Sequence, residues 1–217
     1  MYVWLVDSLH RVFPQSAPEE RRNIRLDLLR GERGSAQVAC RTGEQAATIS
    51  VSVDGPEGID LRVRRVGYVP MAHFTTEVPE AEIDGIGHLP GLVPDPLFEE
   101  SSVESGLFET NSFWITIAAD RDAGPGDHDL TVTVSDANGG SEQLTIALTI
   151  HAAKLPERRD FPVTNWFYAN ALVDWYGVDF LSEPFWTILE PYLRNLAGHG
   201  QDTIYVPLFT PPLDDGG

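Results

Sequence analysis

Cysteine, lysine and long apolar runs are all scarce in this chain of 217 residues. The single cysteine, Cys40, excludes an internal disulfide framework and any metal site built from several cysteines. No apolar run approaches the ~20 residues that a membrane-spanning helix needs. The short apolar stretch at Tyr2 to Val6 is followed at once by Asp7 and has no basic residues before it, so it is not a secretory signal. We therefore expect a cytoplasmic protein.

Positive charge is scarce as well. The chain has 15 Lys and Arg residues against 33 Asp and Glu residues, which gives a formal net charge of -18. Nucleic acids and anionic membrane surfaces both require a basic patch on the protein, so this balance argues against either as a partner. The acidity mainly confers solubility. The sequence leaves the oligomeric state open.

Hydrophobic residues make up 42% of the chain, enough to bury a sizeable core. Up to about residue 155 they alternate with polar residues, which is the pattern of half-buried strands. The alternating runs are 23–30, 48–54, 60–69, 112–119, 129–135 and 142–150. Roughly six to eight antiparallel strands without a long helix predict a β-sandwich. The side chains expected to point into its core are Ile49, Val51, Val53, Leu144, Ile146 and Leu148.

Turn residues separate these runs. Asn138-Gly139 lies between two alternating runs and predicts a hairpin over 129–151. The pair Arg64-Arg65 interrupts the alternation of its own run and suggests a β-bulge. Residues 70–111, by contrast, are rich in proline and show little periodicity. So long a loop is either elaborated to cover a sheet edge or docked on a second domain, and we expect it to pack partly against residues 161–213.

The pattern changes after a short linker at 155–159. Residues 161–168 form an apolar run suited to a buried strand. Ser182 then caps a helix with an apolar face, which Gly198 and Gly200 end. The apolar run 203–209 is a second candidate strand, so the order strand, helix, strand predicts one βαβ unit.

One βαβ unit cannot cover both faces of a parallel sheet. We therefore expect the chain to be the front part of a longer protein. Its two domains would be a β-sandwich over 1–155 and an incomplete second domain over 156–217. An adhesive sandwich has no use for such a βαβ unit.

Several segments, in this order and spacing, resemble one family. The C-terminal ones are Asn165-Trp166-Phe167-Tyr168, Asp174-Trp175-Tyr176-Gly177, Ser182-Glu183-Pro184-Phe185-Trp186, Gly200-Gln201-Asp202-Thr203-Ile204 and Phe209-Thr210-Pro211-Pro212-Leu213-Asp214. The N-terminal ones are Val3-Trp4-Leu5-Val6-Asp7-Ser8, Arg30-Gly31-Glu32-Arg33 through Gln37-Val38, Pro94-Asp95-Pro96-Leu97, and Phe113-Trp114 leading to Pro125-Gly126. Together they are similar to the glycoside hydrolase family 123-like proteins over nearly the whole chain.

The resemblance implies a β-sandwich followed by a (β/α)8 barrel with a glycosidase site, a carbohydrate substrate and no cofactor. In the characterised branch of the family the substrate is a β-linked N-acetylgalactosaminide, whose own 2-acetamido group attacks the anomeric carbon. An adjacent Asp-Glu pair assists: the Asp steers the acetamido group and the Glu is the general acid. This route departs from the usual scheme of two carboxylates.

The chain departs from the family in its carboxylates. It contains no Asp-Glu dipeptide, and its adjacent carboxylates are Glu19-Glu20, Glu99-Glu100 and Asp214-Asp215. The family's pair lies further along the barrel, so we assign no catalytic residue to this chain. We expect residues 1–217 to have no glycosidase activity by themselves.

Barrel enzymes bind their ligands at the C-terminal ends of the strands. The implied barrel therefore points to Trp166, Tyr168 and Asn170 after the first strand and to Thr210 after the second, where Asp214 could line the mouth. Aromatic rings there can stack on a sugar and Asn170 can bind hydroxyl groups, although Trp166 could instead pack inside the barrel. Relatives often carry His at the position of Tyr168 and Asp near Asn170.

Other side chains are better explained by structure. His199 suits a helix C-terminus, and Trp175, Tyr176, Phe185 and Trp186 suit packing of helix on barrel. Two groups contain metal-ligand types but no complete ligand set, and we expect solvated loops and no metal there; they are Asp7 with His10, and Asp127 with His128 and Asp129. The competing functional hypothesis is a non-catalytic β-sandwich that binds sugar or packs in a larger assembly.

Overall fold

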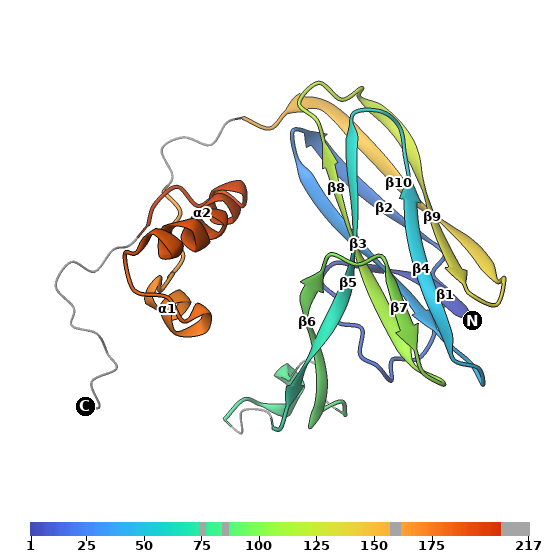
Figure 1. Cartoon of the computed structure of the whole chain (residues 1–217). Helices are drawn as coiled ribbons and strands as arrows, with labels where there is room; N and C mark the ends of the chain where they lie inside the picture. Colours follow the sequence, from blue (N-terminus) through green and yellow to red (C-terminus); the bar gives the residue numbers. More distant parts are fainter. Residues whose placement is uncertain (74–76, 84–86, 157–161, 205–217) are drawn as a thin grey trace. The chain divides into compact units, whose positions relative to one another are not determined.

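The computed structural model describes residues 1–73, 77–83, 87–156 and 162–204 (Figure 1). The chain divides into two compact units, Met1–Leu155 and Pro156–Gly217, called unit 1 and unit 2 below. Unit 1 holds all the described strands, and unit 2 holds the described α-helices. Neither of these helices is long and apolar enough to cross a membrane.

Unit 1 consists of two five-stranded sheets. The first has the order β1 (Tyr2–Asp7), β3 (Arg33–Arg41), β8 (Thr110–Ala119), β5 (Ile59–Met71) and β6 (Gly91–Phe98). The second has the order β2 (Asn23–Arg30), β10 (Ser141–Lys154), β9 (Gly126–Asp136), β4 (Ala47–Asp54) and β7 (Ser102–Ser105). A short 3-10 helix, η1 (Glu80–Glu82), lies between β5 and β6 in the chain.

The core of unit 1 lies between the two sheets. One continuous apolar cluster joins residues such as Phe113 and Ile115 of β8 to Leu130 of β9 and Ile146 of β10, all of which are fully buried. Of the six side chains predicted to point inward, Val53 is partly buried against this cluster and the other five are buried. The prediction of a mainly β fold with antiparallel sheets is confirmed, because alternation places one face of each strand on this core.

The hairpin is also confirmed. Strands β9 and β10 pair antiparallel from Ser141 opposite Ser135 to Ile150 opposite Gly126. In the turn, Asp136 Oδ1 accepts hydrogen bonds from the backbone N–H groups of Asn138 (2.8 Å) and Gly140 (3.1 Å). The predicted hairpin therefore forms, and the side chain of Asp136 holds its loop.

Three details of unit 1 differ from expectation. Strand β2 pairs with β10 in parallel, so the sandwich is not purely antiparallel. The segment 70–111 is not an unbroken loop, since it contains β6 and β7 at the edges of the two sheets. The prolines of β6 hid it from the periodicity, but an edge strand tolerates proline because one side of its backbone has no ladder to complete. The irregularity of β5 lies between Val66 and Tyr68 against β6, not at Arg64-Arg65.

Unit 2 contains two helices in its described part, α1 (Asn170–Tyr176) and α2 (Glu183–Gly198). Helix α2 was predicted, and Ser182 caps it by accepting a hydrogen bond from the N–H of Phe185 (3.3 Å). Helix α1 was not predicted. The two helices share a small apolar cluster around Leu172, Phe185 and Leu189.

The prediction of a strand over 161–168 is wrong for the described residues 162–168, which form no strand. The predicted strand 203–209 lies outside the described residues except for Thr203 and Ile204, which are not in a strand either. The physical reason is that a buried parallel strand needs a backbone ladder, and the described residues of the two segments meet at Val163 without forming one. The N–H groups of Asp202 and Thr203 both donate to the carbonyl oxygen of Val163 at 3.2 Å.

Candidate functional site

Two of the predicted sugar-binding side chains lie together on the surface of unit 2. Trp166 and Tyr168 are 78% and 52% exposed, and their ring centroids are 5.9 Å apart at an interplanar angle of 51°. Trp166 is therefore open in this chain and not packed in a core. We call this pair of rings the aromatic platform.

The alternation of the local sequence explains why the platform faces outward. Phe167, between the two platform residues, packs against the apolar cluster of α1 and α2, and Ala169 does the same. Successive side chains on an extended segment point to opposite sides. Burying Phe167 and Ala169 thus turns Trp166 and Tyr168 away from the helices.

The other two predicted site residues are not part of the platform as described. Asn170 is the first residue of α1, exposed, and so does not end a strand as predicted. The reason is that the apolar residues after it repeat with a helical spacing and bury Leu172. Thr210 and Asp214 lie outside the described residues.

Two polar residues that the sequence analysis did not single out hold the segment before the platform. Gln201 Oε1 accepts a hydrogen bond from Asn165 Nδ2 (3.2 Å), and Gln201 Nε2 donates to the carbonyl oxygen of Thr203 (3.0 Å). Asp202 Oδ1 accepts a hydrogen bond from the N–H of Val163 (2.7 Å). The sequence carried no signal for these roles, because Gln and Asp are ordinary residues in the loop that follows a helix.

The remaining aromatic residues of unit 2 divide into buried and exposed ones. Phe185 is 1% exposed and meets Phe180 edge to face at 5.0 Å, so it is buried as expected, but in the cluster that α1 and α2 share. Trp175, Tyr176 and Trp186 are exposed within the described chain, contrary to the prediction that they pack. An exposed side chain can still form polar contacts. Trp186 Nε1, for example, donates a hydrogen bond to the carbonyl oxygen of Leu181 (3.1 Å).

His199 has the structural role that was predicted. It follows the last residue of α2, and its Nδ1 lies 2.7 Å from the carbonyl oxygen of Asn195. A carbonyl oxygen can only accept, so Nδ1 donates here. The ring therefore adds a second donor to a carbonyl oxygen of the last helical turn, which also accepts from the backbone N–H of His199 (3.1 Å).

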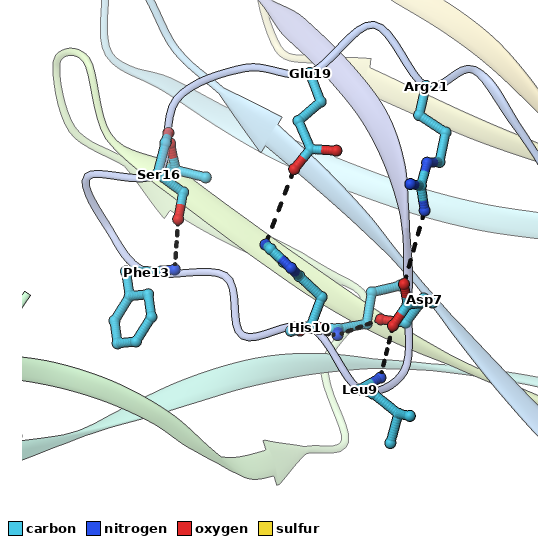
Figure 2. Close-up of polar contacts among 9 residues, drawn as sticks. Asp7, Leu9, His10, Phe13, Ser16, Glu19 and Arg21 are labelled. Atoms are coloured by element: carbon cyan, nitrogen blue, oxygen red, sulfur yellow. Dashed lines mark hydrogen bonds and ion pairs between the residues drawn. The ribbon is translucent and has the colours of Figure 1, made fainter. Parts of the chain in front are cut away.

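The group that contains Asp7 and His10 forms local polar contacts (Figure 2). Asp7 Oδ1 accepts from the N–H of Leu9 (3.0 Å), and Asp7 Oδ2 lies 3.7 Å from Arg21. His10 Nε2 is 3.9 Å from Glu19. In the described ranges no three His, Cys, Asp or Glu side chains gather closely enough to hold a metal ion.

Comparison with known proteins follows from this geometry. The family model of the glycoside hydrolase 123 catalytic domain matches residues 166–216, which begins at the aromatic platform. The structure is similar to a family 123 glycoside hydrolase from Clostridium perfringens, described in connection with glycolipid glycan hydrolysis, with a TM-score of 0.73 and 13% identity. That similarity covers 93% of this chain and 37% of the other chain. No curated protein matches the chain significantly.

Two further solved structures are less similar. A PapD-like domain of human CEP192 has 10% identity and a TM-score of 0.35, covering 70% of this chain and 87% of that one. A Bacteroides ovatus GH5 xyloglucanase has 12% identity and a TM-score of 0.29, covering 68% of this chain and 21% of that one. These scores are too low to support a conclusion about fold or function.

The resemblance to glycoside hydrolase family 123 that the sequence predicted is confirmed by the family match and by the Clostridium structure.

Proposed function

We propose that this chain is the N-terminal part of a glycoside hydrolase that acts on glycans. The observation that carries the proposal is the match of the glycoside hydrolase 123 catalytic domain to residues 166–216. It agrees with the open aromatic platform at the start of that range. Exposed rings suit a carbohydrate, because a sugar presents an apolar ring face together with a rim of hydroxyl groups.

The proposed substrates are β-N-acetylhexosaminides, cleaved with the help of the sugar's own acetamido group. The Asp-Glu pair that this route requires is absent from residues 1–217, so the catalytic carboxylates belong to sequence beyond residue 217. The role of residues 1–217 in this proposal is to bind the sugar. Trp166 and Tyr168 stack on a sugar ring, while Asn170 and Thr210 offer hydrogen bonds to hydroxyl groups.

The proposed architecture is a sandwich domain over 1–155 and the start of a (β/α)8 barrel over 156–217. In the complete barrel, the segment 162–168 and the segment that begins at Thr203 would be neighbours. What supports this is their contact within the described residues, where Val163 forms three hydrogen bonds with Asp202 and Thr203. Two parallel strands could start their backbone pairing at such a contact, and neighbouring strands on either side would stabilise the pairing.

The test is to express residues 1–217 and the longer gene product side by side and to assay both on aryl β-N-acetylgalactosaminide and β-N-acetylglucosaminide. The longer product should turn over at least one of them, and residues 1–217 neither. Trp166→Ala in the longer product should raise KM about tenfold or more. The magnitude is taken from the stacking of a nucleobase on an aromatic side chain, which is worth roughly 1–3 kcal/mol.

The matched control is Trp4→Phe, a change at a fully buried position of unit 1 that keeps an aromatic ring. It should leave KM unchanged. Turnover by residues 1–217 that is lost on mutating one of their own carboxylates would show the active site to be misplaced. A reading frame that stops at residue 217, together with glycan binding by residues 1–155, would favour the non-catalytic sandwich.

A further inference from the structure

Gln201 stands out by its burial. It is 6% exposed, and among the described residues of unit 2 it is the one polar side chain that is buried. Burying an amide without partners is costly, so a buried glutamine is retained where its bonds hold something in place. Its two side-chain bonds, to Asn165 and to the carbonyl oxygen of Thr203, use both ends of the amide.

The backbone of Gln201 forms a third hydrogen bond. Its N–H donates to the carbonyl oxygen of Leu196 in the last turn of α2 (3.0 Å). Gln201 therefore connects the end of α2, the segment before the aromatic platform and the segment that begins at Thr203. Asp202 adds the bond from the N–H of Val163 at 2.7 Å. We call Gln201 and Asp202 together the polar clamp.

The clamp acts on a segment with little support of its own. Residues 162–168 form no strand, so no ladder sets the direction of their backbone. Val163 and Asn165, which the clamp holds, are the last anchored positions before Trp166. The direction in which the platform rings project is then set by the clamp on one side and by the burial of Phe167 on the other.

We propose that Gln201 is a positioning residue for sugar binding, acting through Asn165 on the platform ring of Trp166. The proposal rests on the proposed function and names the element that orients its binding surface. Gln201 itself does not touch the sugar. Its loss should therefore weaken the binding of ground state and transition state alike, which raises KM and leaves kcat in place.

The experiment compares Gln201→Leu and Asn165→Ala in the longer gene product, with aryl β-N-acetylgalactosaminide and β-N-acetylglucosaminide as probes. Either change should raise KM about fivefold to tenfold with kcat within about twofold, the size expected for one lost hydrogen bond. The double variant should be no worse than the worse single one, because both remove the same bond. Asn165 is exposed, so its variant keeps the test open if Gln201→Leu fails to fold.

Thr187→Ala is the control, since Thr187 lies on α2 and its hydroxyl bonds only within the helix, to the carbonyl oxygen of Glu183 (3.1 Å). Its KM should not change. An unchanged KM in both test variants, or a fall in kcat alone, would overturn the proposal. Exchange of the Val163 amide gives a readout that needs no activity and should be faster in Gln201→Leu. If the wild-type longer product is inactive but the Val163 amide still exchanges faster in Gln201→Leu, the proposed function is wrong and the clamp is supported. If the Val163 amide exchanges at the same rate in wild type and Gln201→Leu, the clamp is refuted.

Discussion

Cys40 is a residue whose acid–base chemistry is altered by burial in the fold. Its thiol is buried on β3, with Sγ 3.5 Å from the carbonyl oxygen of Asn111, and burial raises its pKa from 9.0 to about 12. Burial disfavours the thiolate because the apolar core solvates a charge poorly. The residue is thus a core side chain.

The raised pKa predicts a loss of stability at high pH. Above pH 9 the unfolded chain gives up this proton while the folded chain keeps it, so the free energy of unfolding falls as the pH rises toward about 12. The slope from this group is about 1.4 kcal/mol per pH unit. Urea unfolding of wild type and Cys40→Ala at a series of pH values from 8 to about 11 measures it. The variant should lack that slope, and parallel curves for the two proteins would contradict the assignment.

At the scale of elements, alternation predicted β2, β4, β5, β8, β9 and β10. It did not predict β1 and β3, although both strands also place one face on the core. The edge strands β6 and β7 escaped, because prolines and short length leave no period to detect. The strand expected at 161–168 failed for a different reason. Its apolar pattern is there, but an apolar run becomes a strand only where neighbouring backbone completes its hydrogen bonds. The sequence pointed to Trp166 and Tyr168, the two residues of the platform. It did not point to the clamp, because the role of Gln201 depends on its contact with Asn165, which is distant in the sequence.

The hairpin turn gives a prediction about a single element. Gly139 has φ +93° and open space around the position of a Cβ, so replacing it by Ala costs backbone strain without a clash. We expect Gly139→Ala to lower the free energy of unfolding by roughly 1–2 kcal/mol.

The matched variant is Gly124→Ala, in a turn where the Cβ position is equally open and the φ does not lie in the left-handed region. Its effect should stay within about 0.5 kcal/mol. Thermal or urea unfolding of the two variants compares them directly. Equal effects would mean that the turn does not depend on the left-handed conformation of Gly139.

At the scale of the whole molecule, the described parts of the two units differ in the size of their apolar cores. Unit 1 has a continuous core between two sheets, formed entirely by its own residues. The described part of unit 2 has one small cluster on two helices and leaves large aromatic side chains such as Trp175 exposed. The sequence predicted this contrast through its change of period after residue 155. It could not predict the described geometry of 162–168, which depends on partners that a local pattern does not specify.

The central claim is that residues 162–204 begin a catalytic barrel. The most direct measurement is amide hydrogen exchange of residues 164–168 in two proteins, residues 1–217 and the longer gene product. We expect fast exchange in the shorter protein and exchange slower by about a hundredfold or more in the longer one, because a barrel strand would bury and pair these amides. Equally fast exchange in both proteins would show that no strand forms there and would contradict the account.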